Sequence, residues 1–149
     1  LDAAGVEKAA VACQSMGGWT GLRLAVEQPD RVTALVLANT TGGVSTPNAD
    51  AAIADARKAF ADHGIAASAV AKDFPARNPA LAYLYSHIGG LNVQLTDDLH
   101  SKSSASTTPA EVALLALPTM LLTSDNDTIF PPFAIKEIAA LIPGAELTQ

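Results

Sequence analysis

The feature that most constrains the fold is a pair of short apolar runs separated by one helical segment. Residues 9–13 contain only alanine, valine and cysteine, and residues 32–38 read VTALVLA. Runs of this length without polar alternation are typical of strands buried on both faces of a parallel sheet. Residues 19–27 have the apolar spacing of a helix, which Pro29 ends. Strand, helix and strand in this order predict a right-handed βαβ unit.

The middle of the chain has a different pattern, because no strand is indicated between about residues 46 and 107. Helices are expected over residues 50–64, 66–73 and 79–88, with proline and glycine between them. We therefore divide the chain into a first core segment, a helical insertion and a second core segment, with the bounds 1–43, 44–107 and 108–149.

The last segment returns to the pattern of the first. Thr108 and Glu111 form a capping box around Pro109, which predicts a short helix over residues 109–115. The expected elements that follow are a buried strand, a polar loop, a helix and the start of another strand, over residues 118–123, 124–127, 131–141 and 145–147. The sequence thus predicts an α/β fold with a parallel sheet and a helical insertion.

Composition limits the partners of the chain. The 149 residues are 49% hydrophobic and 16% charged, which suffices for one buried core. The net charge is −6 and the nine basic residues are scattered, so no nucleic-acid partner is expected. The longest apolar stretch, residues 112–122, contains Pro118 and is shorter than the roughly 20 residues of a membrane span, so no membrane partner is expected.

The sequence offers no pattern for a metal or another cofactor. Cys13 is the single cysteine, which excludes an intrachain disulfide and fits a cytoplasmic location. The three histidines have no i, i+4 spacing. Asp125 and Asp127 lack the twelve-residue loop and closing glutamate of a calcium site. We therefore expect no metal and no cofactor.

Ser15 lies where the first expected strand meets the first expected helix. A tight turn at this place forces the serine into a strained backbone conformation, which requires small residues two positions before and two positions after it. Cys13 and Gly17 hold those positions. Such a turn would raise the hydroxyl above the sheet edge, with the N–H of Met16 and the helix N-terminus facing an oxyanion.

Two segments resemble a known superfamily. Residues 11–40, VACQSMGGWTGLRLAVEQPDRVTALVLANT, resemble the nucleophile-elbow segment of the α/β-hydrolases, except that Cys13 replaces the first glycine. Residues 117–132, LPTMLLTSDNDTIFPP, are similar to the acid-bearing segment of that family. The resemblance implies part of an α/β-hydrolase core with a helical cap insertion, in the branch of serine esterases, lactonases and carbon–carbon hydrolases.

The resemblance also assigns roles to particular residues. Ser15 corresponds to the nucleophile, Asp127 to the acid of the triad and the Met16 N–H to one oxyanion donor. Two alternatives to the serine nucleophile remain: Cys13 is itself the nucleophile, or Ser15 only caps the helix. Asp125 is an alternative acid, since loop registers vary by a residue or two.

Both loop aspartates have a structural alternative as well, because loop carboxylates often only cap the next helix. Asn39 ends the second expected strand, where some relatives carry their acid. An amide cannot stabilise an imidazolium as a carboxylate does, which leaves Asp127 as the acid.

The catalytic histidine is missing from its expected place. The family order is serine, acid, histidine, yet residues 128–149 contain no histidine. His63, His87 and His100 precede Asp127 and are more simply explained as surface residues. Because the His-Gly loop of the second oxyanion donor is missing too and the chain starts with Leu1, we expect a C-terminal fragment, truncated at both ends and inactive by itself.

The predicted function of the full-length protein is acyl transfer from a small carbonyl substrate: an ester, a lactone or an activated carbon–carbon bond. The rival is a non-catalytic ligand-binding protein on the same fold. A flavodoxin-like domain fits less well, because residues 14–18 are not a phosphate-binding loop. Six insertion residues either line a substrate pocket or pack the cap helices together: Phe60, Phe74, Tyr83, Leu84, Tyr85 and Ile88.

Overall fold

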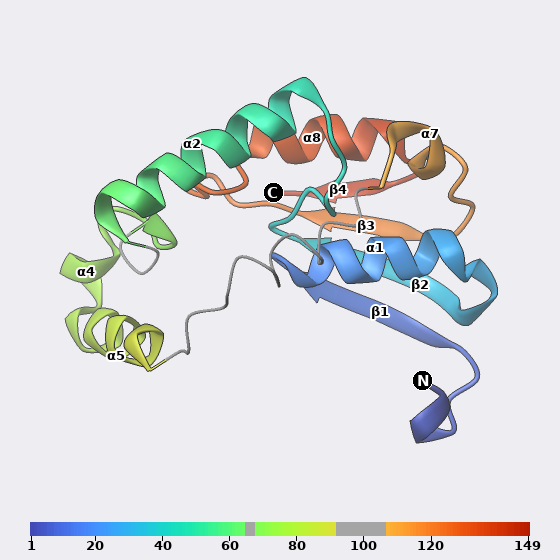
Figure 1. Cartoon of the computed structure of the whole chain (residues 1–149), viewed down its shortest axis with the longest axis horizontal. Coiled ribbons are helices and arrows are strands. Elements are labelled where there is room, and N and C mark those ends of the chain that lie inside the picture. The colour runs from blue at the N-terminus through green and yellow to red at the C-terminus, as the bar shows by residue number, and fades with distance from the viewer. Residues whose placement is uncertain (65–67, 92–106) are drawn as a thin grey trace.

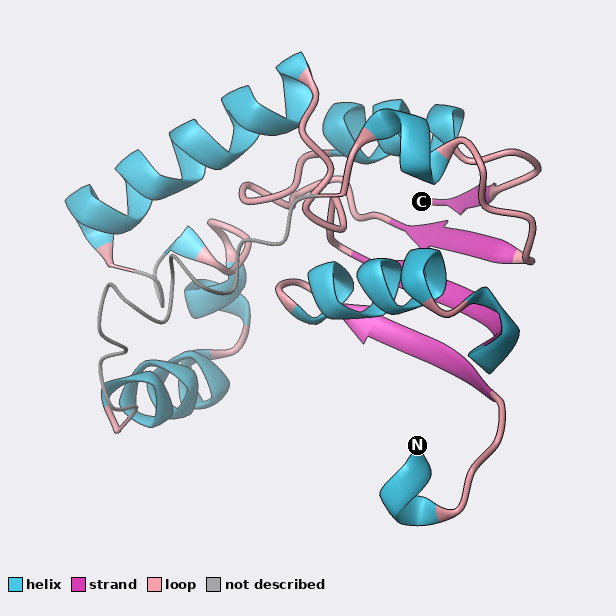
Figure 2. Cartoon of the chain, turned by 45° about the vertical axis from the view of Figure 1, so that its right-hand side comes forward, coloured by secondary structure: helices cyan, strands magenta, loops and turns pink. Residues whose placement is uncertain are grey.

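The computed structural model describes residues 1–64, 68–91 and 107–149. Within them, four strands form one parallel sheet in the order β1-β2-β3-β4, as labelled in Figure 1. Figure 2 shows the same strands in magenta, with the helices in cyan. The strands are β1 (Ala9–Gln14), β2 (Val32–Ala38), β3 (Thr119–Leu122) and β4 (Glu146–Thr148). The predicted α/β class and parallel sheet are confirmed. All four strands therefore direct their carboxyl ends to the same edge.

Strand register determines which side chains share a face of the sheet. Cys13 lies opposite Leu37, which lies opposite Leu121 and then Leu147. This row faces the helices α1 (Gly17–Glu27) and α8 (Pro132–Leu141), and its central leucines are fully buried. One hydrophobic cluster joins the sheet to both helices, with Leu22, Leu35, Leu37, Leu121, Ile135 and Ile138 among its members. Both helices thus pack on the same face.

The opposite face of β1 departs from the prediction. Residues 9–13 were predicted to be buried on both faces, but Ala10, Ala12 and Gln14 are exposed. Their side chains remain uncovered because α1 and α8 pack on the other face, and β1 pairs with β2 alone among the described residues. Burial in β1 therefore alternates along the strand.

The chain enters and leaves α1 through ordered turns. A 3-10 turn, η2 (Pro29–Arg31), leads from the helix into β2. The Arg31 guanidinium donates to the Asp2 carboxylate at 2.5 Å and to the Glu7 carbonyl at 2.6 Å. These bonds attach the N-terminal turn η1 (Asp2–Ala4) to the sheet.

Helix α2 (Pro47–His63) begins three residues before the predicted start. The Thr46 hydroxyl accepts a hydrogen bond from the Ala49 N–H, and Pro47 occupies the first helical position. Thr46 also donates to the Glu137 carboxylate of α8. Three buried alanines line its inner face: Ala49, Ala52 and Ala56. The N-terminal part of α2 is thereby packed on the core.

The two ends of the predicted insertion lie side by side. Val44 and Thr107 are both buried and form an isolated parallel β-bridge. Beyond α2, the short helices α4 (Phe74–Arg77) and α5 (Pro79–Gly90) contact each other and lie on the side to which the strand arrows point (Figure 1). The insertion therefore starts and ends at one place on the core and extends beyond the carboxyl edge of the sheet.

Only part of the helix prediction for the insertion was right. The helix over residues 79–88 is confirmed as α5. The helix over residues 66–73 is wrong for residues 69–73, which form bends and turns, and residues 66–67 lie outside the described residues. A helix begins instead at Phe74, because Pro75 fits the first helical turn, where no N–H is needed.

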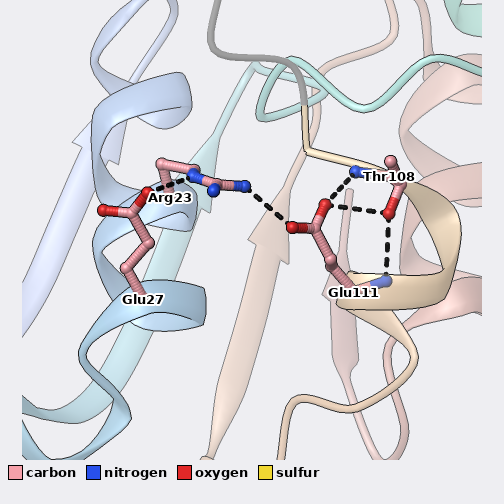
Figure 3. Close-up of polar contacts among 4 residues, drawn as sticks. All are labelled: Arg23, Glu27, Thr108 and Glu111. Carbon is pink, nitrogen blue, oxygen red and sulfur yellow. Dashed lines mark hydrogen bonds and ion pairs between the residues drawn. The ribbon is translucent and has the colours of Figure 1, made fainter.

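Helix α7 (Pro109–Val112) confirms the capping box. Thr108 accepts from the Glu111 N–H, and the Glu111 carboxylate accepts from the Thr108 N–H. The helix is shorter than the predicted 109–115. Arg23 of α1 bridges Glu27 at 2.6 Å and Glu111 at 2.9 Å (Figure 3). The ion pair of Arg23 with Glu111 thus connects α1 to α7.

Candidate active site

Ser15 occupies a tight turn between β1 and α1. Its φ of +51° lies in the left-handed region, which costs a non-glycine residue on the order of 1–3 kcal/mol. The Ser15 N–H donates to the Ala38 carbonyl at 3.2 Å, and the Ser15 carbonyl accepts from the Gly18 N–H at 3.0 Å. The turn is thus attached both to the end of β2 and to the first turn of α1.

Glycines of α1 allow the helix to approach the strands behind this turn. A Cβ at Gly18 would lie 2.4 Å from the Thr40 Oγ1, and a Cβ at Gly21 would lie 2.2 Å from the Cys13 Sγ. The predicted need for a small residue at Gly17 is wrong as a matter of space, since a Cβ there would lie 4.0 Å from the nearest atom. Gly17 and Gly21 are four residues apart, which places them on one face of the helix. This spacing could have predicted the close contact between Gly21 and Cys13, but the prediction was not made.

The Cys13 side chain is directed away from the turn and toward α1. Its sulfur packs against Gly21, and the residue is half-buried. Burial raises the pKa of the Cys13 thiol, although a hydrogen bond with the Gly21 backbone opposes the shift. The thiol is therefore protonated at neutral pH and covered by the helix.

Met16 holds the N-cap position of α1, and its side chain is exposed. Its carbonyl accepts from the Trp19 N–H at 3.1 Å. No acceptor in the described part of the chain is recorded for the Met16 N–H. This amide is next to Ser15 in the chain and stands at the positive end of the helix.

Asp127 lies in the loop that follows β3. Its Oδ1 accepts from the Ile129 N–H at 2.9 Å and from the Phe130 N–H at 2.8 Å, while its own N–H donates to the Ser124 carbonyl. These bonds fold the loop around the carboxylate. The side chain is half-buried, so its position is fixed while one side stays accessible.

Asn39 connects Asp127 to the end of β2. Its Nδ2 donates to the Asp127 Oδ2 at 2.7 Å and to the Ser124 Oγ at 3.0 Å. Its φ is +48°, and its N–H donates to the Leu122 carbonyl at 2.9 Å. From the sequence, Asn39 was interpreted only as a substitute for an acid, and this contact was not predicted. An asparagine at a strand end, where left-handed backbone is tolerated, was the available signal.

These residues share one edge of the sheet. Ser15, Asn39 and Asp127 follow the carboxyl ends of β1, β2 and β3, which are neighbouring strands. In the described chain, Ser15 and Asn39 are the only non-glycine residues with positive φ. The structure therefore brings Ser15 and Asp127 to the same side, with Asn39 between their strands.

The other candidates lie apart from this arrangement. Asp125 is exposed and accepts a hydrogen bond from the Gln149 side chain. His63 is exposed at the end of α2, and His87 stacks on Tyr83 of α5 at 3.8 Å, with its Nδ1 2.8 Å from the Tyr83 carbonyl. His100 lies outside the described residues.

The predicted pocket residues are only partly buried. Phe60 and Phe74 are half-buried, whereas the four candidates on α5 are exposed: Tyr83, Leu84, Tyr85 and Ile88. The Thr128 hydroxyl donates to the Ser68 carbonyl at 2.6 Å, which joins the Asp127 loop to the insertion.

A surface hollow of about 660 Å³ lies at the amino ends of the strands, between the end of α1 and residues 111–118. It is therefore on the edge opposite Ser15.

Two further properties concern the described residues alone. They contain no group of three or more histidine, cysteine or acidic side chains arranged to hold a metal ion. None of their helices combines the length and the apolar character needed to cross a membrane.

Solved structures of similar fold are α/β-hydrolases. A hydrolase from Pseudomonas aeruginosa PA01 is 27% identical, with a TM-score of 0.74. An enol-lactonase from Burkholderia xenovorans LB400 is 24% identical, with a TM-score of 0.73. In both cases the match covers 99% of this chain and 58% of the other chain, so the chain spans less than two thirds of these hydrolases. A thermophilic esterase from Thermogutta terrifontis is 19% identical over 98% of this chain and 57% of its own, with a TM-score of 0.69.

The fold is therefore that of an α/β-hydrolase, of which the chain contains part of the core. The family model Hydrolase_4, described as "Serine aminopeptidase, S33", matches residues 2–148. The chain belongs to this family. A search of curated proteins gave no match.

Proposed function

We propose that the full-length protein is a serine hydrolase that uses Ser15 as the nucleophile in acyl transfer. The observation that carries this proposal is the left-handed backbone of Ser15, at the same sheet edge as Asp127. A strained serine between a strand and a helix supports the role because the turn holds the hydroxyl clear of the sheet. Asp127 is the proposed acid and the Met16 N–H one of the oxyanion donors.

The reaction follows the chemistry of acyl transfer. A histidine removes the Ser15 hydroxyl proton as the oxygen attacks the carbonyl carbon, and the Met16 N–H stabilises the resulting oxyanion. The histidine then protonates the leaving group, and water releases the acyl group from Ser15. Asp127 orients the imidazole through its accessible carboxylate oxygen. We assign the base to a part of the full-length protein outside residues 1–149, because similar hydrolases are considerably longer than this chain.

Cys13 is a weaker candidate for the nucleophile than Ser15. Its sulfur is packed under α1, and the raised pKa of the thiol keeps it in the less reactive protonated form. Ser15 is half-buried as well, but it lies in the turn at the N-terminal end of α1 rather than under the helix. Both differences favour the hydroxyl.

We propose a small ester or lactone as the substrate class, with an activated carbon–carbon bond as the third member. Among proteins of similar fold are an enol-lactonase and an esterase, which supports these carbonyl classes without choosing one. The 149-residue chain alone is proposed to be inactive. Among the described residues, neither His63 nor His87 forms a hydrogen bond with Ser15 or Asp127, and the His87 ring lies within hydrogen-bond distance of the Tyr83 carbonyl on the same helix.

Hydrolysis of a nitrophenyl ester by the full-length protein tests the proposal. Ser15→Ala should reduce kcat by at least about 10⁴-fold, because no other group replaces the attacking oxygen. Cys13→Ala is the matched control and should retain activity. Activity retained in Ser15→Ala would refute the nucleophile. Ligand binding without turnover in the unaltered protein would instead favour a non-catalytic binding protein.

A further inference from the structure

We propose that Asn39 is a positioning residue that holds the Asp127 carboxylate for its work on the base. This inference rests on the proposed function. Asn39 is not expected to touch the substrate or the reacting atoms. It acts through the 2.7 Å hydrogen bond from its Nδ2 to the Asp127 Oδ2.

The hydrogen bonds at Asp127 leave one acceptor site free. An ionised carboxylate offers about four lone-pair positions. Two N–H groups, of Ile129 and Phe130, use Oδ1, and the Asn39 amide uses one position on Oδ2. One position remains on Oδ2, and this is the one that an imidazole N–H would occupy. Asn39 thus selects which lone pair of Asp127 faces the base.

The orientation of the Asn39 amide is dictated by its partners. A carboxylate can only accept hydrogen bonds, so the NH₂ group and not the carbonyl oxygen must face Asp127. The second N–H of the same group donates to the Ser124 Oγ, which engages both donors of the amide. The side chain therefore has one arrangement that satisfies both neighbours.

The backbone of Asn39 is held as firmly as its side chain. Its N–H donates to the Leu122 carbonyl at the end of β3, the strand that leads to the Asp127 loop. Its φ of +48° is one that asparagine adopts more readily than most residues. Without the amide, the Asp127 Oδ2 would be free to swing about the anchored Oδ1.

Two substitutions separate the amide from the backbone that carries it. Asn39→Gly keeps the left-handed conformation and removes both donors. Asn39→Ala also removes both donors but keeps a Cβ, and it adds no carboxylate at a strand end where some relatives carry their acid. Loss of one hydrogen bond to a charged group predicts a fall in kcat on the order of 10- to 100-fold for Asn39→Gly, with KM nearly unchanged. A fall of at least the same size is expected for Asn39→Ala.

Asn126→Gly is the matched control, because Asn126 is exposed in the same loop as Asp127. It should leave kcat and thermal unfolding close to those of the unaltered protein. If Asn39→Gly fails to fold, Asn39→Ala provides the same test without an increase in backbone freedom. Equal kcat in the folded Asn39 variants and the unaltered protein would overturn the inference.

A double-mutant cycle in the full-length protein distinguishes positioning from a general structural effect. In an Asp127→Ala background, Asn39→Gly should cause no further loss of kcat, because its only route to the reaction has been removed. An equal loss in both backgrounds would overturn the inference. Ser15→Ala distinguishes failure of the proposed function from failure of this inference. Activity in Ser15→Ala would refute the proposed function. An inactive Ser15→Ala together with a fully active Asn39→Gly would refute the positioning role alone.

Discussion

Helix α1 lies very close to strand β1, and the residues at their contact are small. Gly21 is the closest approach, because the Cys13 sulfur occupies the space that a Cβ there would need. The same packing removes the thiol from the turn, which supports Ser15 over Cys13 as the proposed nucleophile. The turn predicted a need for a small residue at position 17, where the structure leaves room for a Cβ, whereas the close contact at Gly21 was not predicted.

Gly21→Ala should therefore destabilise the full-length protein. The added methyl group would lie 2.2 Å from the Cys13 Sγ, and overpacking of this kind typically costs about 1–3 kcal/mol in the free energy of unfolding. Chemical denaturation measures the change. Gly17→Ala on the same helix is the matched control and should be close to neutral. The double variant Cys13→Ala/Gly21→Ala should recover part of the loss; no recovery would show that the sulfur is not the obstacle.

The residues of the candidate site differ in how far sequence could predict their positions. Ser15 and Asp127 each follow a run with the pattern of a buried strand, and parallel strands bring their carboxyl ends to one edge. Their place at that edge was therefore predictable, while their catalytic roles stay proposals. The bond between Asn39 and Asp127 was not predictable, because it depends on two loop conformations 88 residues apart.

At the scale of elements, one carboxylate joins two helices. Glu111 closes the capping box of α7 and receives the Arg23 guanidinium of α1 (Figure 3). Hydrogen bonds from the Thr108 N–H and hydroxyl, and then from Arg23, lower the pKa of Glu111 to about 2. The ionised side chain is thus favoured in the folded state.

This shift predicts a pH dependence of stability. The folded pKa lies below the ordinary value of 4.5, so the stabilisation is complete above about pH 4.5 and is lost as the pH falls toward 2. Glu111→Gln keeps the cap but removes the charge, and should flatten the decline in unfolding free energy within this window. Glu27→Gln removes the other partner of Arg23 and should change the profile less. Parallel profiles for Glu111→Gln and the unaltered protein would contradict this assignment.

Elements with a local signal were predicted better than elements set by tertiary packing. The capping box of α7 and the strand patterns of β2 and β3 are local, and their elements occur where predicted. The helix predicted over 66–73 has no capping residue, and its residues 69–73 form bends and turns instead. Pro75 was interpreted as a break, whereas it lies in the first turn of α4.

For the whole molecule, the uncovered face of the sheet is the most consequential feature. Ala10 and Ala12 of β1 are exposed, and Val36 and Met120 beside them are only half-buried. Apolar faces of parallel sheets are normally covered by helices. Similar hydrolases are longer than this chain, so we expect the rest of the full-length protein to cover this face.

The 149-residue chain alone should therefore bind the dye ANS more strongly than the full-length protein and should not hydrolyse nitrophenyl esters. Dye fluorescence measures the exposed apolar surface, and the ester assay tests the proposal that the base lies outside residues 1–149. Full-length protein at equal concentration is the control. Esterase activity of the chain alone would contradict the account and would require one of its own histidines to act as the base.

Covalent labelling of the full-length protein with a fluorophosphonate tests the central claim most directly. The reagent forms a bond between phosphorus and an activated serine oxygen while fluoride leaves, and peptide mass mapping then locates the adduct. We predict a single adduct on Ser15, absent from Ser15→Ala and retained in Cys13→Ala. An adduct on another residue, or no adduct on an enzyme that hydrolyses esters, would contradict Ser15 as the nucleophile.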